Sequence, residues 1–211
     1  MPDPKSNNVY SQLQNSSNWF SEAVLYFRTL GFYEEIANLS DIELVDKIKT
    51  LCEYDKYVAG VKLTRIVQLL LILKEDRKRV WFCDTEVCWD QQYVKFMKEW
   101  GKISCGTFHP EDISEIRYED YVKIYFTQNG ESFDIYAHNF GEWLDLGVFG
   151  WINDIIRGTK YHFWNIVPDT QEVCIVCLTI EQKEKLENDL GAMFEEPDDF
   201  KYNPFPDGQS T

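Results

Sequence analysis

Residues 121–137 have the sequence YVKIYFTQNGESFDIYA, and this stretch decides the fold. Two segments of alternating apolar and polar residues flank Asn129-Gly130, the dipeptide preferred in a type I′ hairpin turn. A two-residue loop sets the strand register, so antiparallel strands are predicted over 121–128 and 131–137. The predicted cross-strand pairs are Phe126 with Phe133, Ile124 with Ile135, and Val122 with Ala137. One face of the hairpin is then apolar, and the other carries Lys123, Tyr125, Asp134 and Tyr136.

A second hairpin is predicted over 161–167 and 172–178, joined by a Pro-Asp-Thr-Gln turn. Residues 173–178 (VCIVCL) have no polar outward face, so this strand is expected to be central with both faces covered. A short strand over 113–118 precedes the first hairpin. Helices are predicted over 19–30, 40–54, 57–74, 89–100, 148–157 and 179–190. These elements predict an α+β fold: a mainly antiparallel sheet built from the two hairpins, helices packed on it, and a helical N-terminal region.

Two of the helix starts carry a capping signal. Ser40 stands three residues before Glu43, and Thr179 stands three residues before Gln182. In each pair the hydroxyl can accept from the amide of the third residue, whose side chain can reach back to the cap amide. The spacing therefore predicts helices that begin directly after Ser40 and Thr179.

The helix over 89–100 has one aromatic stripe, which we interpret as core, and Gly101 is expected to end it. The stripe is Trp89, Tyr93, Phe96, Met97 and Trp100. Residues 74–79 (KEDRKR) form the most basic cluster. We interpret this cluster as the solvated end of a helix, with nucleic-acid contact as the alternative.

A chain of 211 residues fits one globular domain. Within it we expect a disordered leader over 1–18, a helical region over 19–79, an acidic α+β core over 80–194 and a flexible acidic tail over 195–211. The first residues have no secretory signal pattern, and the longest apolar run, 66–73, is far shorter than a bilayer span. The expected location is cytoplasmic, without a membrane partner.

The six cysteines predict buried free thiols and no cofactor. Cys174 and Cys177 have the spacing of a zinc knuckle, yet they lie inside a predicted strand. Residues three apart in a strand point to opposite faces, so the pair cannot easily bind one ion.

The acidic excess lies in one part of the chain. Residues 1–80 carry 11 Lys/Arg and 11 Asp/Glu, whereas residues 81–211 carry 10 and 25. Such a field favours encounter with cationic partners and repels nucleic acid and anionic membranes. The alternative explanation is solubility alone. The sequence contains no GxSxG, P-loop, GxGxxG or HExxH motif, so we do not expect an enzyme.

Two sets of residues are candidates for function. The first mixes aromatics with acids and is typical of a protein-contact surface, unless its aromatics only anchor loops to the core. It comprises Tyr118, Glu119, Asp120, Tyr125, Tyr136, Glu142, Trp143 and Asp145. The second is a weak acid or metal cluster of Asp84, Glu86 and His109. Helix capping by the two acids and a plain loop position for the histidine are the alternatives.

Several short stretches resemble a family of bacterial and cyanobacterial proteins without an assigned activity. They are RVW at 79–81, DTE at 84–86, EWGKIS at 99–104, PEDI at 110–113 and CLT at 177–179, so the resemblance spans about 80–190. It implies no catalytic or binding residue. More loosely, a small acidic α+β chain with aromatic hairpins is similar to immunity proteins of polymorphic toxin systems.

The leading hypothesis is an acidic protein-binding module of the immunity type that neutralises a basic partner, such as a nuclease toxin domain. One alternative is a metal-dependent hydrolase or other enzyme that uses Asp84, Glu86 and His109. Another is a structural or regulatory protein without a catalytic role. The sequence leaves the oligomeric state open.

Overall fold

The computed structural model describes residues 18–59, 65–167 and 172–204. The expected leader, apart from Asn18, lies outside these residues. The helices are α2 (Trp19–Thr29), α3 (Asp41–Ala59), α4 (Arg65–Leu73), α5 (Gln92–Ile103), α6 (Val148–Ile155) and α7 (Ile180–Leu190), with 3-10 turns η1 (Glu34–Ile36) and η2 (Pro197–Phe200). The strands are β1 (Val80–Asp84), β2 (Glu111–Arg117), β3 (Tyr121–Gln128), β4 (Glu131–His138), β5 (His162–Ile166), β6 (Glu172–Leu178) and β7 (Phe194–Glu195). The predicted α+β class with N-terminal helices is confirmed.

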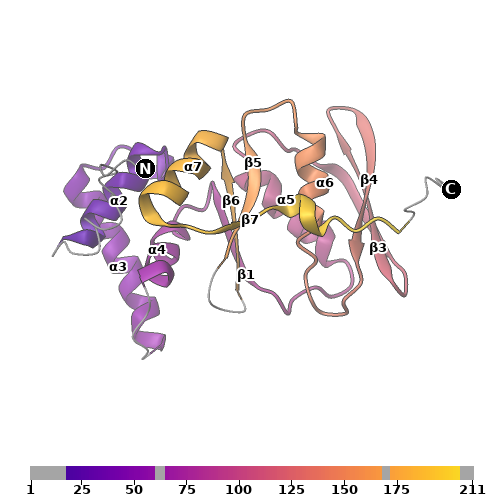
Figure 1. The fold of residues 1–211 in the computed structure, drawn as a ribbon, viewed down its shortest axis with the longest axis horizontal. Helices are drawn as coiled ribbons and strands as arrows, with labels where there is room; N and C mark the ends of the chain where they lie inside the picture. Colours follow the sequence, from indigo (N-terminus) through magenta and orange to yellow (C-terminus); the bar gives the residue numbers. More distant parts are fainter. Residues whose placement is uncertain (1–17, 60–64, 168–171, 205–211) are drawn as a thin grey trace, which may run out of the picture.

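The strands form two antiparallel sheets, in the orders β1-β6-β5-β7 and β2-β3-β4. The two predicted hairpins therefore belong to different sheets and do not build a single one. The reason is visible in Figure 1, where α5 and α6 lie between the two sheets. These helices pack against both sheets. They carry several of the largest buried side chains of the core, among them Trp100 and Phe149.

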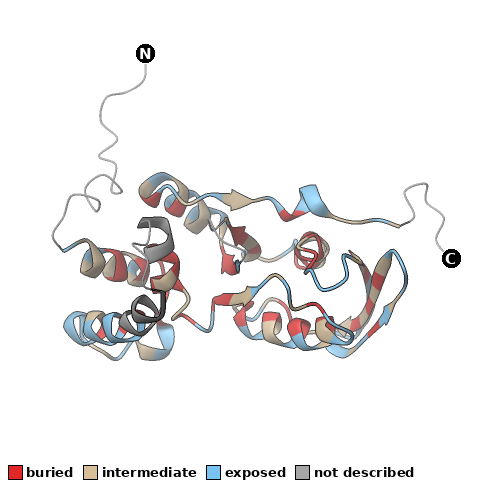
Figure 2. Cartoon of the chain, turned by 90° about the horizontal axis from the view of Figure 1, so that it is seen from below, coloured by how far each residue is buried: buried red, intermediate tan, exposed pale blue. Residues whose placement is uncertain are grey.

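Strand β6 is central and separates two hydrophobic cores. Val173, Ile175 and Cys177 belong to the core that contains α5, α6 and the three-stranded sheet. The alternate residues Cys174, Val176 and Leu178 belong to the core formed with α2, α3, α4 and α7. Buried residues accordingly gather where the helices face the sheets (Figure 2). The predicted double coverage of this strand is confirmed, as are the opposite directions of Cys174 and Cys177.

The first hairpin has the predicted register. Phe126 pairs with Phe133, Ile124 with Ile135, and Val122 with Ala137. Asn129 and Gly130 both have positive φ, at 52° and 81°, as a type I′ turn requires. Strand β2 adds to the free side of β3, and its register shifts between Glu111 and Ser114 at a β-bulge.

The capping boxes are present at both predicted helix starts. The Ser40 hydroxyl accepts from the Glu43 amide at 3.4 Å, and the Glu43 carboxylate accepts from the Ser40 amide at 2.8 Å. Thr179 and Gln182 make the equivalent pair of hydrogen bonds. The helix after Ser40 continues to Ala59, beyond the expected end near residue 54.

Helix α5 is shifted relative to its prediction. Gln91 has a left-handed φ of 61°, so the helix begins at Gln92 and leaves Trp89 outside it. Gly101 lies within the helix and does not end it. A Cβ at Gly101 would lie 3.2 Å from Cδ of Pro110, so the glycine allows the segment after α5 to pack closely on the helix.

The charged cluster after α4 is only partly solvated, contrary to expectation. Asp76 and Arg79 are buried, at 5% exposure each. Arg79 packs between the N-terminal helices and the first core, with its guanidinium over the rings of Phe32 and Tyr161. Asp76 and Arg79 are therefore packed inside the fold, whereas Arg77 and Lys78 are exposed.

The described part of the expected flexible tail, residues 195–204, packs on the rest of the fold. Strand β7 pairs with β5, and η2 packs on α6 with Pro197 buried. Lys201 binds Asp154 of α6 at 2.8 Å. Gly150 of α6 leaves room for this close packing, because a Cβ there would lie 2.8 Å from the Pro197 carbonyl oxygen.

None of the helices in the described part of the chain has the length and apolar character needed to span a bilayer.

Candidate protein-contact surface

Two loops at one end of the three-stranded sheet are joined to form a continuous surface. One follows β1 and covers residues 85–91, and the other follows β4 and covers residues 139–144. The amide of Cys88 donates to the carbonyl of Glu142 at 2.7 Å, and the amide of Leu144 donates to the carbonyl of Thr85 at 3.0 Å. These two backbone bonds hold the loops side by side.

Arg117, the last residue of β2, binds both loops. Its Nη1 donates to the side-chain oxygen of Asn139 at 2.8 Å and to the carbonyl of Gly141 at 3.2 Å. Its Nη2 donates to the carbonyls of Cys88 and Trp89, each at 3.1 Å. One guanidinium therefore fixes the position of both loops through carbonyl oxygens.

Glu115 on β2 fixes the end of the first loop through hydrogen bonds to backbone amides. It is buried, and its carboxylate accepts from the amides of Gln91 at 2.8 Å and Val94 at 3.3 Å. A carboxylate at this place satisfies free amides of the α5 N-terminus and interacts favourably with the helix dipole. Burial nevertheless raises the pKa of Glu115 above its ordinary value.

Large aromatic side chains stand exposed on the joined loops. Trp89 is 60% exposed, Phe140 53% and Trp143 40%. They border a shallow hollow of about 560 Å³, whose floor includes Arg117 and Asn139. Exposed aromatics gathered around one hollow differ from the scattered apolar residues of an ordinary surface.

The predicted residues 118–120 adjoin this hollow. The side-chain amide of Asn139 donates to the carbonyls of Tyr118 at 2.7 Å and Glu119 at 3.2 Å, and the amide of Asn139 donates to the carbonyl of Asp120 at 2.9 Å. Tyr118 is 42% exposed, and its ring stacks on that of Tyr121 at 4.6 Å between centroids. The turn before β3 thus belongs to the same surface.

The charge of this surface is negative. The side chains of Asp90 and Glu142 are exposed at the hollow, and those of Glu119 and Asp120 are exposed in the adjoining turn. Arg117 is half-buried, and its positive charge faces backbone carbonyls. We call the joined loops and the adjoining turn the acidic aromatic surface: Trp89, Asp90, Tyr118, Glu119, Asp120, Phe140, Glu142 and Trp143.

Tyr125 and Tyr136 lie on the outer face of the hairpin, as predicted, and are half-buried. Between them Lys123 binds Asp134 at 2.8 Å. Hydrogen bonding to Asp134 is the main cause that raises the pKa of Lys123, and hydrogen bonding to Lys123 in turn lowers the pKa of Asp134. Tyr136 reaches the acidic aromatic surface through Tyr121, at 6.0 Å between ring centroids.

The prediction for Asp145 is wrong. This residue is 5% exposed, and its carboxylate accepts from the amides of His138 at 2.6 Å and Gly147 at 2.8 Å. Burial raises the pKa of Asp145. Asp145 therefore holds the second loop in place from inside and offers no charge to a partner.

Trp89 and Phe140 were missed by reasoning from the sequence. Trp89 stands one helical turn before Tyr93, so the spacing predicts that it belongs to the buried stripe of α5. Phe140 follows β4 without a periodic pattern. The left-handed backbone of Gln91 separates Trp89 from the helix, and a glutamine in the sequence does not indicate that conformation.

Asp84 and His109 make separate local contacts, and the side chain of Glu86 is exposed. Asp84 accepts from the Glu86 amide at 3.0 Å and closes a turn after β1. The two acids do not cap α5, because the carboxylate that accepts from amides at the start of this helix is that of Glu115. A ring nitrogen of His109 contacts the Gly106 carbonyl at 3.0 Å. No group of three or more His, Cys, Asp or Glu side chains placed for a metal ion occurs among the residues that the structure describes.

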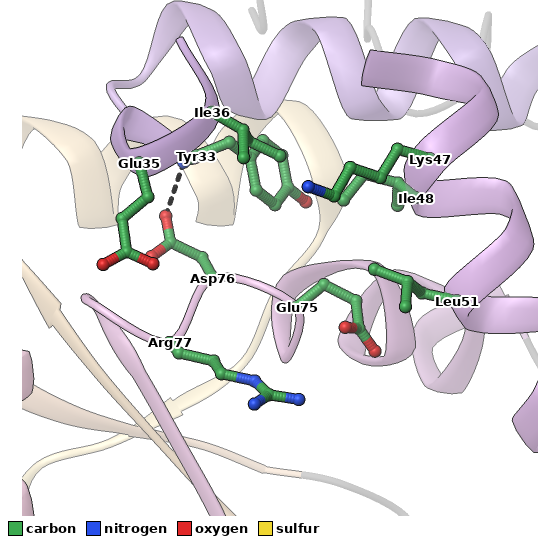
Figure 3. A pocket seen from close by; sticks show the side chains of 9 residues that line it. All are labelled: Tyr33, Glu35, Ile36, Lys47, Ile48, Leu51, Glu75, Asp76 and Arg77. Atoms are coloured by element: carbon green, nitrogen blue, oxygen red, sulfur yellow. Dashed lines mark hydrogen bonds between the residues drawn. The ribbon is translucent and has the colours of Figure 1, made fainter. Parts of the chain in front are cut away.

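A second hollow, of about 210 Å³, lies between α3 and the segment after α4 (Figure 3). Lys47, Ile48 and Leu51 enter it from α3, opposite Asp76 and Arg77. The buried carboxylate of Asp76 already accepts from the amides of Tyr33 at 2.6 Å and Lys78 at 3.0 Å. The bond to Tyr33 ties the segment after α4 to the N-terminal helices and the bond to Lys78 closes a local turn, so this carboxylate has a structural role.

No protein-family model, curated protein or solved structure matches this chain.

Proposed function

We propose that this chain is an acidic protein-binding module that captures a basic protein on its acidic aromatic surface. The observation that carries the proposal is the exposure of Trp89, Phe140 and Trp143 around one hollow, with acids at its rim. Tryptophan and other aromatics supply much of the affinity in protein interfaces, and rim charges select and steer the partner.

The scaffold under the surface favours binding without large rearrangement. Arg117 holds both loops through four hydrogen bonds to Asn139, Gly141, Cys88 and Trp89. Loops that are ordered before binding lose less conformational entropy when the partner arrives. A preformed aromatic site is suited to tight, stoichiometric capture.

The charge distribution favours a cationic partner. Residues 81–211 contain every element of the surface and carry 25 Asp/Glu against 10 Lys/Arg. A cationic protein is attracted by this field, whereas nucleic acid and anionic membranes are repelled. We infer a role of the immunity type, in which the module blocks a basic partner such as a toxin domain in the cytoplasm.

The test begins with cross-linked capture from native lysate, followed by surface plasmon resonance on the isolated basic partner. Trp89→Ala and Trp143→Ala should each weaken binding about tenfold or more, mainly through faster dissociation. Ile42→Ala is the matched control, because Ile42 is 76% exposed on the N-terminal helices. Equal effects of all three variants would contradict the proposed surface.

A charge test separates steering from solubility. Neutralising Glu119, Asp120 and Glu142 to their amides should slow association markedly at 50 mM salt and little at 500 mM, since exposed charges are screened. The control neutralises three exposed acids elsewhere: Asp46, Glu131 and Glu184. If the control slows association equally, only the total charge matters and the surface has no specific role.

A further inference from the structure

Phe140 and Trp143 project from the same face of the second loop. The two residues form an antiparallel β-bridge across Gly141 and Glu142, and the partners of such a bridge point to one side. Gly141 has a φ of 73°, which allows the tight turn between them. The turn therefore presents both exposed aromatic side chains to the hollow that they line.

The ring of Phe140 has one covered face and one open face. It stacks on the ring of His138 at 4.1 Å between centroids, with 11° between the ring planes. The ring of Tyr202 in turn packs against His138 at 4.6 Å. Phe140 is nevertheless 53% exposed, so its other face is open to a ligand. A ring that is already supported in this way loses little conformational freedom when a ligand stacks on it.

Two carboxylates at the hollow have no cation beside them. The side chains of Asp90 and Glu142 are exposed there, and they make no hydrogen bond or ion pair with the residues that the structure describes. By contrast, Asp134 and Asp154 each bind a lysine at 2.8 Å. The oxygens of Asp90 and Glu142 are therefore free to accept from a cationic ligand.

Arg117 lines the same hollow, but its charge is directed toward the protein. Its two Nη atoms donate to four oxygen atoms of the two loops, and none of these oxygens belongs to a carboxylate. The guanidinium thus stabilises the loop backbone and leaves Asp90 and Glu142 unneutralised. With two acids and one arginine, the hollow has a net negative charge, and the exposed Glu119 and Asp120 in the adjoining turn add to it.

We propose that this hollow binds one arginine side chain of the basic partner, an inference that rests on the function proposed above. The guanidinium lies among the rings of Trp89, Phe140 and Trp143, and its N–H groups donate to the carboxylates of Asp90 and Glu142. Aromatic faces attract cations, most strongly in tryptophan. A planar guanidinium suits the site better than an ammonium group, because it can stack on a ring while its edge donates to carboxylates, and because it is more weakly hydrated.

NMR titration of the isotope-labelled full chain tests the ligand class without the partner. The probe is Nα-acetyl-arginine amide, and Nα-acetyl-citrulline amide is the matched control of the same shape without charge. The arginine probe should shift the indole N–H signals of Trp89 and Trp143 to saturation, with a Kd at least about threefold below that of the citrulline probe. The signal of Trp100, which is fully buried, should not move.

Nα-acetyl-lysine amide separates guanidinium recognition from simple attraction to an acidic chain. It has the same charge as the arginine probe and should bind more weakly. Equal binding of the arginine and citrulline probes, equal binding of the arginine and lysine probes, or shifts that rise without saturation would each overturn the proposal.

Variants locate the bound probe. Glu142→Gln should weaken binding of the arginine probe roughly twofold and leave the citrulline probe unaffected, because only a charged ligand gains from the carboxylate. Glu131→Gln is the matched control, since Glu131 is exposed at the opposite end of β4 and should have no effect. Trp89→Ala should reduce the shift of the Trp143 signal, and Trp89→Phe should largely retain it. Equal effects of Glu142→Gln and Glu131→Gln would refute the site.

The arginine site and the proposed function fail in different experiments. If Trp89→Ala and Trp143→Ala leave the affinity for the captured partner unchanged, the contact surface itself is wrong. If these variants lose the partner while the unmodified chain does not distinguish the arginine probe from the citrulline probe, the surface stands and only the arginine site is refuted.

Discussion

Exchanging Asp145 for asparagine tests whether this acid is a buried structural residue. Its two carboxylate oxygens accept from different amides, those of His138 and Gly147. Asparagine has one side-chain oxygen, so one of these amides would face an NH₂ group instead of an acceptor. Glu142→Gln is the matched control, because Glu142 lies in the same loop with its side chain exposed.

The magnitude follows from the unpaired amide. A buried N–H without a partner costs about 1–3 kcal/mol. For a chain of this length each kcal/mol lowers Tm by about 2–4 °C. Glu142→Gln removes an exposed charge and should change the free energy of unfolding by less than about 0.5 kcal/mol. The two acid-to-amide changes are chemically alike, so only their environments separate them.

Urea unfolding at neutral pH, followed by tryptophan fluorescence, measures both variants against the unmodified chain. The expected result is a lower midpoint for Asp145→Asn with an unchanged slope, and no change for Glu142→Gln. If Asp145→Asn unfolds like the unmodified chain, its carboxylate does not hold the loop. Asp145 would then again be a candidate residue of the contact surface.

Three further changes test other parts of the fold. Ser40→Ala should cost about 1 kcal/mol in chemical denaturation, because the capping box at the start of α3 is lost. Gly150→Ala should cost about 1–3 kcal/mol and increase proteolysis of the C-terminal segment, whereas Gly158→Ala, with open space around its Cβ, should change neither. Hydrogen bonding to Lys201 lowers the pKa of Asp154 below its ordinary 3.8 in the folded state, so this stabilisation is complete above about pH 4 and is lost as pH falls through the folded value. The stability difference between the unmodified chain and Asp154→Asn, measured by urea unfolding from pH 6 downward, should therefore vanish in acid, and a constant difference would contradict the ion pair.

Local signals in the sequence predict both hairpins and the two helix starts that carry a capping box. The Asn129-Gly130 turn sets the pairing of Ile124 with Ile135, because turn geometry and side-chain alternation act on neighbouring residues. Ser40 and Glu43 likewise interact within one helical turn. In both cases the interacting residues lie close together in the sequence, so the local sequence pattern is enough to predict their contact.

The sequence does not show how elements that are distant along the chain pack against one another. The separation of the hairpins into two sheets depends on α5 and α6 packing between them. The burial of Asp145 depends on the His138 amide across a loop, although its neighbours Glu142 and Trp143 are exposed. Along the sequence these three residues look alike, since each is a polar or amphipathic residue in an irregular stretch.

The sequence predicts that the contact surface is aromatic and acidic, but it identifies only some of the residues that form it. The mixture of aromatic and acidic groups predicts Tyr118, Glu119, Asp120, Glu142 and Trp143. The structure places Glu142 and Trp143 at the hollow and the turn of residues 118–120 beside it. Arg117, which organises both loops, carries no local signal. Its importance comes only from the carbonyl groups that the fold brings to it.

The central strand β6 also constrains how this chain can change over time. Its alternate residues close two hydrophobic cores, so a substitution at Ile175 is felt among α5 and α6, and one at Val176 among the N-terminal helices. Neither core can be lost without exposing one side of this strand to water. The N-terminal helices are therefore not an appendage that recombination could exchange freely. Heating should melt both cores in a single calorimetric transition, and inherited variation should be least tolerated along this one strand.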